Sequence, residues 1–345
     1  MKDFPKSRYA ALLFRGLNNI LTKKPLSVSF EITHQCSADC NHCNWGGRVD
    51  EVKLTPKEYA EICRNLQPVI AHLSGGEPTL RTDIIDIIAE MSNPKGWPVT
   101  QIITHGAKLS FKRYKEFKAA GLDRVCISLD FPDERHDDWR HIPGLFEKLN
   151  INLPKIAALK LRDINMNSCI TADNVHDLPD ILRLANSWGI PVNFSAYTPL
   201  RTNDNTFNIN NKKDLGDALT ESIKELISMK RAGYSMVTSE TQLMKYKEYL
   251  LYGTSGKCQA GYRFLVIQPN GRFTPCAMIP KYFRSKDQMI REFSKTNDCQ
   301  GCFIATRAET EKTTSEFIKD IGNYVWGKSS KLGEPFHKET RQAVA

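Results

Sequence analysis

Ten cysteines occur in this sequence of 345 residues, and seven of them fall into two spaced groups. The first group is the run Cys36-x3-Cys40-x2-Cys43. The second group contains four members, which are Cys258, Cys276, Cys299 and Cys302. No uninterrupted apolar stretch is long enough to span a membrane, and charge breaks up the N-terminus, so we expect a cytoplasmic protein. Because that compartment is reducing, the spacings indicate metal ligands rather than disulfides.

The first group has two interpretations. Three thiolates can hold a 4Fe–4S cluster and leave one iron without a protein ligand. Alternatively, His34 or His42 could complete a zinc site with the three cysteines. The loop that carries the group follows the first expected strand of an alternating α/β series, which is where such folds place active sites. This position favours the iron–sulfur interpretation.

The second group also has two interpretations. Four thiolates can enclose a second cubane cluster completely, or they can hold one structural zinc ion. The other three cysteines, Cys63, Cys126 and Cys169, lie in an expected helix or in expected strands. We interpret them as buried core thiols.

Strand-like and helix-like segments alternate through the first two hundred residues, which predicts a parallel α/β architecture. Six such units are fewer than the eight of a full barrel. We therefore predict a partial (β/α)6 TIM-like barrel with a small cysteine-rich C-terminal module. The expected strands span residues 26–34, 68–74, 99–104, 123–130, 164–170 and 190–197.

Shifts in pattern along the chain suggest five segments. The N-terminal one is an expected amphipathic helix whose apolar stripe comprises Tyr9, Leu13, Leu17, Ile20 and Leu21. We expect that stripe to pack across the open side of the partial barrel. Peripheral contact with an anionic membrane surface is the alternative, because basic residues flank the stripe. The segments are 1–25 (the helix), 26–205 (the core), 206–255 (a helical connection), 256–305 (the cysteine-rich module) and 306–345 (a charged tail).

Two motifs together resemble the radical S-adenosylmethionine (SAM) superfamily. They are CSADCNHC at residues 36–43, after the first expected strand, and SGGEP at residues 74–78, after the second. The resemblance covers about residues 26–200. It implies an enzyme whose 4Fe–4S cluster chelates SAM and cleaves it reductively to a 5′-deoxyadenosyl radical, which abstracts hydrogen from a substrate or adds to it.

The resemblance also assigns cofactor-binding residues. Gly75 and Gly76 match the turn that approaches the methionyl amino group of SAM, since a residue without a Cβ atom allows close approach. Glu77 matches the acid that orders this turn. On the fourth strand, Ser128 and Asp130 match the family pattern and should face the barrel interior.

The sequence departs from the family pattern at two positions. Phe131 stands where a glycine is common, and His105 stands where an asparagine near the ribose is usual. Arg140 resembles the last residue of an HDxxR element, so it either reaches the SAM carboxylate or forms a structural ion pair. On the sixth strand, candidate cavity residues are Asn193, Ser195 and Tyr197.

The spacing of the second cysteine group resembles the shorter, Twitch form of the SPASM extension, which implies one auxiliary 4Fe–4S cluster over about residues 256–303. A radical SAM enzyme needs a reductant such as flavodoxin or ferredoxin. The substrate stays unidentified, with lipids, sugars and peptides as the candidate classes.

The net charge of +9 is interpreted mainly as solvated surface, and no nucleic-acid partner is expected. A non-enzymatic iron–sulfur electron carrier or a zinc-binding protein is the alternative function.

Overall fold

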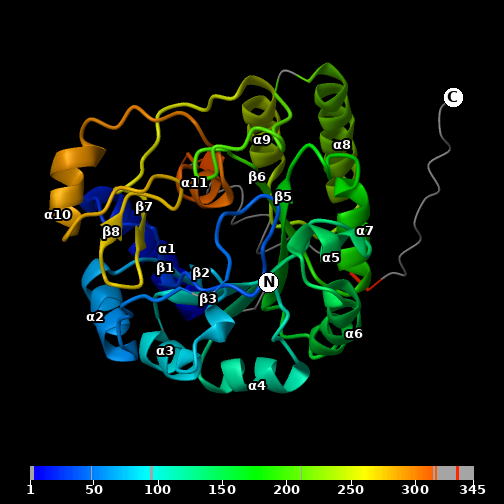
Figure 1. Cartoon of the computed structure of the whole chain (residues 1–345). Helices are drawn as coiled ribbons and strands as arrows, with labels where there is room; N and C mark the ends of the chain where they lie inside the picture. The colour runs from blue at the N-terminus through cyan, green and yellow to red at the C-terminus, as the bar shows by residue number, and fades with distance from the viewer. Residues whose placement is uncertain are drawn as a thin grey trace, which may run out of the picture.

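The computed structural model describes residues 4–47, 49–93, 96–210, 212–313, 315–316 and 332–333. Within these residues one eight-stranded sheet has the order β6-β5-β4-β3-β2-β1-β7-β8 (Figure 1). Every neighbouring pair is parallel except β7 and β8, which are antiparallel. The strands are β1 (Ser27–Thr33), β2 (Ile70–Gly75), β3 (Val99–Thr104), β4 (Arg124–Ser128), β5 (Ile164–Ile170), β6 (Val192–Ala196), β7 (Phe264–Ile267) and β8 (Phe273–Thr274).

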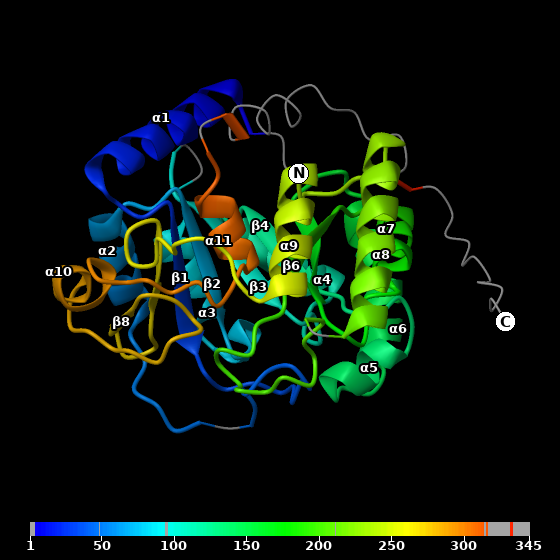
Figure 2. The same ribbon diagram turned by 90° about the horizontal axis from the view of Figure 1, so that it is seen from above.

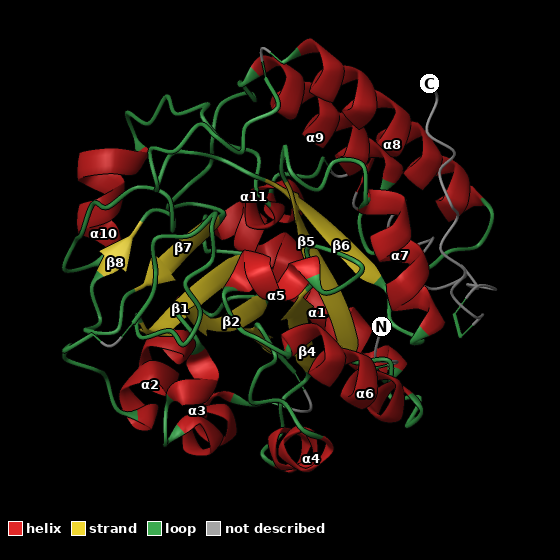
Figure 3. Cartoon of the chain, turned by 45° about the vertical axis from the view of Figure 1, so that its right-hand side comes forward, coloured by secondary structure: helices red, strands yellow, loops and turns green. Residues whose placement is uncertain are grey.

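The first six strands are those that the sequence predicts, so an α/β fold with a mostly parallel sheet is confirmed. Helices follow the strands and cover one side of the sheet, as Figure 3 shows for α2, α3, α4, α6 and α7. The helices are α1 (Lys6–Thr22), α2 (Pro56–Leu66), α3 (Ile84–Met91), α4 (Phe111–Ala119), α5 (Arg135–Arg140), α6 (Leu145–Ala157), α7 (Leu178–Ser187), α8 (Lys213–Arg231), α9 (Glu240–Tyr252), α10 (Lys286–Met289) and α11 (Ala305–Thr310), with short turns η1 (Pro78–Leu80) and η2 (Ile290–Ser294).

Alternation along the strands separates the two faces of the sheet. In β1 the apolar residues Val28, Phe30 and Ile32 are fully buried and pack in the main core, whereas Ser29 on the opposite face is partly exposed. The same period of two places polar side chains on the inner face of the other strands. The apolar core therefore lies between the sheet and the outer helices.

The N-terminus of α2 is set by local sequence. Thr55 and Glu58 form a reciprocal capping box, and Pro56 occupies the first turn. Tyr59 and Cys63 of this helix are buried against the sheet, so the interpretation of Cys63 as a core thiol is confirmed. The cap places the start of α2 shortly after the loop that carries the first cysteine group.

The cysteine-rich segment 256–305 adds β7 and β8 to the sheet, and β7 pairs in parallel with β1. Helix α11 contacts both β6 and β7, so it spans the gap between the ends of the strand series (Figure 3). The Ala305 amide donates to Ser195 Oγ at 3.0 Å, which fixes this helix to β6. Most of the expected charged tail, 306–345, lies outside the described residues.

The expected packing of α1 is wrong. This helix does not place its apolar stripe against the barrel: Leu17 is 45% exposed and Leu21 is 82% exposed. It lies instead across the amino ends of the strands, with Arg8 paired to Asp123 at the start of β4. Figure 2 shows α1 at one end of the sheet and the loop that follows β1 at the other. Polar contacts hold this helix because the amino ends of the strands offer a buried carboxylate rather than an apolar groove.

Candidate active site

The first cysteine group lies in the loop between β1 and α2, at the carboxyl edge of the sheet. The Cys36 amide donates to the Gly47 carbonyl at 3.1 Å, and the Cys43 amide donates to the Cys40 carbonyl at 3.0 Å. Cys40 is buried, while the other two thiols are partly exposed. Backbone hydrogen bonds within the loop thus fold it back on itself, and all three thiols lie on this short segment.

The two histidines that could complete a zinc site have other contacts. The ring of His34 stacks on Trp45 with 4.1 Å between ring centroids, and its Nε2 lies 2.9 Å from Gln268 Oε1. The ring of His42 stacks on Trp139 at 5.2 Å. Among the described residues, no group of three or more His, Cys, Asp or Glu side chains is arranged to hold a single metal ion.

Two guanidinium groups reach the thiols of this loop. Arg140 Nη1 donates to Cys40 Sγ at 3.5 Å, and Arg201 Nη2 donates to Cys43 Sγ at 2.9 Å. Arg201 also lies over the Trp45 ring at 5.5 Å. Both contacts place a positive charge beside a sulfur of the loop, where thiolate is the form that binds metal.

Burial acts against ionisation of the thiols. It raises the pKa of Cys36 to about 12, and it raises the pKa of Cys40, where Arg140 partly offsets the effect. Metal binding must therefore displace protons from these sulfurs. Sulfur donors set beside two cations fit an iron–sulfur cluster, because part of the added thiolate charge is then compensated.

The glycine turn that follows β2 packs directly on the start of the cysteine loop. A Cβ atom on Gly75, whose φ is +125°, would lie 2.1 Å from the Thr33 carbonyl oxygen, and one on Gly76 would lie 2.3 Å from the Gln35 carbonyl oxygen. The amides of Gly76 and Glu77 donate to these same two carbonyls at 2.8 Å. The glycines are thus required for contact between the two loops, and their approach to SAM stays a prediction.

Glu77 is buried beneath this turn. Its carboxylate accepts hydrogen bonds from the Thr104 hydroxyl at 2.7 Å, the His105 amide at 3.0 Å and the Thr79 amide at 3.1 Å. His105 Nε2 lies 3.2 Å from Glu77 Oε2 and 3.2 Å from Ser37 Oγ in the cysteine loop. Burial lowers the pKa of His105 despite the nearby carboxylate. Glu77 and His105 therefore tie the ends of β2 and β3 to the loop.

Asp130 and Arg140 form a buried ion pair behind the cysteine loop. Burial would raise the pKa of Asp130, but Arg140 holds it below its usual value. The Cys169 amide donates to the same carboxylate at 3.0 Å, and the Asp130 amide donates to His136 Nδ1 at 3.2 Å. Of the two roles expected for Arg140, the structure contains the ion pair, and contact with SAM stays a prediction. Ser128, at the end of β4, is partly exposed on the inner face of the sheet.

The polar residues of β6 are engaged in packing contacts. Asn193 bonds to the side chains of Asn167 and Thr238, at 3.1 and 2.9 Å. Tyr197 is buried and donates to the Asp204 carbonyl at 2.9 Å. These contacts fix the end of β6 and the residues after it, from which Arg201 reaches the cysteine loop.

The four cysteines of the second group lie in the segment that precedes α11. The Cys258 amide donates to the Cys299 carbonyl at 3.2 Å, and burial raises the pKa of Cys258 to about 12. Burial also raises the pKa of Cys276 and Cys302, and nearby thiols of the group add to each shift. All four sulfurs are thus within electrostatic range of another member of the group.

Arg307 holds the two loops of this second group together. It is 1% exposed and donates to the Cys302 carbonyl at 2.6 Å and to the Ser255 carbonyl at 3.0 Å. It also donates to the Gly256 carbonyl and pairs with Glu311 at 2.7 Å. Sequence analysis missed Arg307 and Arg201, since neither lies in a motif.

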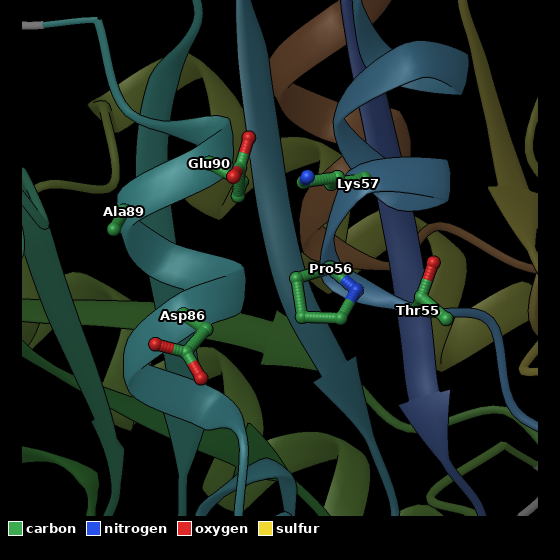
Figure 4. Close-up of a pocket in the computed structure, with 6 residues that line it drawn as sticks. All are labelled: Thr55, Pro56, Lys57, Asp86, Ala89 and Glu90. Carbon is green, nitrogen blue, oxygen red and sulfur yellow. The ribbon is translucent and has the colours of Figure 1, made fainter.

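A surface hollow lies between α2 and α3, on the outer helical layer (Figure 4). Lys57 and the carboxylates of Asp86 and Glu90 contribute its charged groups. None of the predicted site residues lines it. Its lining residues are Thr55, Pro56, Lys57, Asp86, Ala89 and Glu90.

Comparison with known proteins identifies the central part of the chain. Residues 30–185 match the family model described as Radical SAM superfamily. The AdoMet-dependent heme synthase of Methanosarcina barkeri is 29% identical over 181 residues, which are 49% of this chain and 49% of that protein. The PqqA peptide cyclase of Xanthomonas campestris pv. campestris is 26% identical over 262 residues, which are 73% of this chain and 67% of that protein. The chain thus spans about half the length of the heme synthase.

Among solved structures, Streptococcus suis SuiB bound to S-adenosylmethionine has a similar fold. The TM-score is 0.60 at 16% identity, and the match covers 77% of this chain and 64% of that chain. Residues 30–185 therefore resemble a radical SAM superfamily domain, and the relatives that share this part of the chain are named as enzymes.

Proposed function

Starting from the radical SAM superfamily domain at residues 30–185, we propose that this protein binds a 4Fe–4S cluster through Cys36, Cys40 and Cys43 and cleaves SAM reductively. The observation that carries the proposal is that the loop with these three cysteines lies against two guanidinium groups and a tightly packed glycine turn at one edge of the sheet. When bound, the cluster supplies the electron that converts SAM to a 5′-deoxyadenosyl radical.

The residues around the loop have separate tasks in this proposal. Arg140 and Arg201 offset the negative charge of the cluster thiolates. Gly75 and Gly76 bring the backbone after β2 up to the loop, where the same turn can receive the methionyl amino group of SAM. Glu77 holds that turn in place through Thr104 and His105. Ser128 completes the assigned SAM contacts from the inner face of β4.

We also propose that Cys258, Cys276, Cys299 and Cys302 enclose an auxiliary 4Fe–4S cluster in a Twitch-like module. The burial of Cys258, Cys276 and Cys302 supports this proposal, as does Arg307, which joins the loops that carry Cys258 and Cys302. The Arg307 guanidinium lies close to Cys258 and Cys302, so it also lowers the free energy needed to ionise these thiols.

The substrate is not assigned by these relatives. One is named a heme synthase and another a peptide cyclase, and a shared radical generator serves unrelated substrates. Lipids, sugars and peptides remain the proposed classes, with a flavodoxin or ferredoxin as the proposed electron donor.

Anaerobic reconstitution followed by an assay for 5′-deoxyadenosine tests the proposal. Reduced protein with SAM should release 5′-deoxyadenosine, and Cys40→Ala should abolish the release. Cys302→Ala should remove the auxiliary cluster and leave at least part of the SAM cleavage. Cys63→Ala is the matched control, because Cys63 is a buried core thiol outside both groups. Release that survives in Cys40→Ala would show that the loop is not the catalytic centre.

A further inference from the structure

The outward face of α1 carries an unusual set of exposed apolar side chains. They recur at positions i, i+1, i+4, i+7 and i+8, which places them on one side of the helix. Every other helix among the described residues carries at most two large hydrophobic residues of comparable exposure. The set, with exposed fractions, is Leu13 (38%), Phe14 (72%), Leu17 (45%), Ile20 (38%) and Leu21 (82%).

The opposite face of α1 is held to the barrel by polar contacts. Arg8 forms a buried bidentate pair with Asp123 at 2.6 and 2.7 Å. Asn19 Nδ2 donates to the carbonyls of Pro25 and Gln67, both at 2.8 Å. A surface helix ordinarily buries its apolar face and exposes its polar face, and α1 does the reverse. Contiguous exposed apolar surface of this kind marks an interaction site.

The charge around this face is positive. Residues 4–30 contain no aspartate or glutamate. Lys23 is exposed at the C-terminal end of α1, with Lys24 beside it, and Lys286 of α10 donates to the Lys23 carbonyl at 2.9 Å. In a two-fold contact, a second copy of α1 would offer no acidic side chain to pair with these lysines, which disfavours self-association. An apolar ridge with basic residues at its end complements an anionic lipid surface.

We propose that α1 docks this protein on an anionic lipid surface, with Phe14 and Leu21 inserted at the boundary between headgroups and acyl chains. The helix lies in the plane of the interface and does not cross it. Because α1 covers the amino ends of the strands, docking leaves the cysteine loop at the opposite end facing away from the lipid (Figure 2). This inference is independent of the proposed SAM cleavage.

Sedimentation of the full-length protein with vesicles tests the proposal. Wild-type protein should sediment with phosphatidylcholine vesicles that contain phosphatidylglycerol, much less with phosphatidylcholine alone, and less as salt is added. The double variant Phe14→Ser with Leu21→Ser should lower the partition coefficient at least tenfold. Lys23→Asn should weaken binding at low salt only, since asparagine tolerates the left-handed backbone there.

The matched control is Tyr252→Ser on α9, because Tyr252 is 71% exposed and lies outside the proposed face. It should bind vesicles as the wild type does. Wild-type protein that fails to sediment with anionic vesicles at low salt would overturn the proposal. A wild-type dimer that the double variant converts to a monomer would assign the face to a second copy. A lower melting temperature of the double variant would show that another part of this chain covers the face.

Discussion

At the scale of single residues, two arginines from distant parts of the chain determine the charge at the first cysteine group. Arg140 comes from α5, and Arg201 follows β6 and lies 158 positions from Cys43. Each donates to a different sulfur, so the positive charge is spread along the loop. Hydrogen bonds to cluster sulfurs are among the features that set reduction potentials.

Replacement of Arg201 should therefore change the potential of the cluster. Arg201→Gln removes a positive charge that stabilises the more negative, reduced form, so the midpoint potential should fall by on the order of tens of millivolts. A redox titration followed by electron paramagnetic resonance measures the change. Arg231→Gln is the control, since Arg231 lies on the far end of α8. An unchanged potential in Arg201→Gln would exclude an electrostatic role for this contact.

The glycine turn offers a second residue-scale prediction. Gly76→Ala would place a methyl group 2.3 Å from the Gln35 carbonyl oxygen, so the cysteine loop must move away from the turn. The variant should incorporate less iron at the first group and should melt at a lower temperature than the wild type. Gly256→Ala is the matched control, because no atom lies within 4 Å of its added methyl group. Equal iron content in both variants would contradict this account of the turn.

The sequence identified the cysteines and the glycine turn because these positions form short local motifs. It did not identify Arg201 or Arg307, since each acts through contacts with residues remote in sequence. The two roles considered for Arg140 also could not be separated from the sequence. The ion pair is evident only in the structure, where Asp130, just after β4, lies next to Arg140.

At the scale of elements, the sequence predicts the α1 helix and its apolar stripe correctly, but it predicts the wrong surroundings for that stripe. The helix and its stripe are present as predicted, but the stripe faces outward. Its orientation depends on Asp123, which lies 115 positions from Arg8 and is buried beneath the helix. Periodicity indicates which side chains share a face of a helix. It does not indicate which face packs against the rest of the protein.

The pair between Arg8 and Asp123 should dominate the stability of this attachment. Arg8→Met would leave the Asp123 carboxylate buried without its guanidinium partner, which typically costs about 3–5 kcal/mol. Urea unfolding of the apoprotein should show a loss of this size. Leu17→Ser on the exposed face should change the free energy of unfolding by less than about 0.5 kcal/mol. If Leu17→Ser were the more destabilising variant, the outward orientation of the stripe would be wrong.

Strand β7 is a second element whose place depends on distant contacts. Its four residues form a short apolar run, Phe264–Ile267, which does not show by itself whether a strand or a buried helix forms. It pairs in parallel with β1, on the opposite side of β1 from β2, and it also pairs with β8. The segment that carries the second cysteine group is thus joined to the same sheet as the first six strands.

At the scale of the whole molecule, the alternating series of strands and helices was predictable because each unit carries its own periodicity and end signals. The way in which the gap between β7 and β6 is covered was not predictable, because it depends on contacts that α11 makes with both strands. Helix α11 begins three residues after Cys302 and contains Arg307. The segment that spans the gap between β7 and β6 therefore also supports the loop of Cys302.

The iron content of the whole protein follows from the two proposed clusters. Anaerobic reconstitution should give about eight irons per chain, since each cubane carries four. Replacing Cys36, Cys40 and Cys43 together by alanine should leave about four. Arg307→Met should also lower the content towards four, because the loops that carry Cys258 and Cys302 lose their common donor. In that variant the iron that remains should be the SAM-responsive cluster, which paramagnetic resonance with and without SAM can identify. Stoichiometric zinc without iron–sulfur absorbance in the wild-type protein would instead favour the zinc interpretation for both groups.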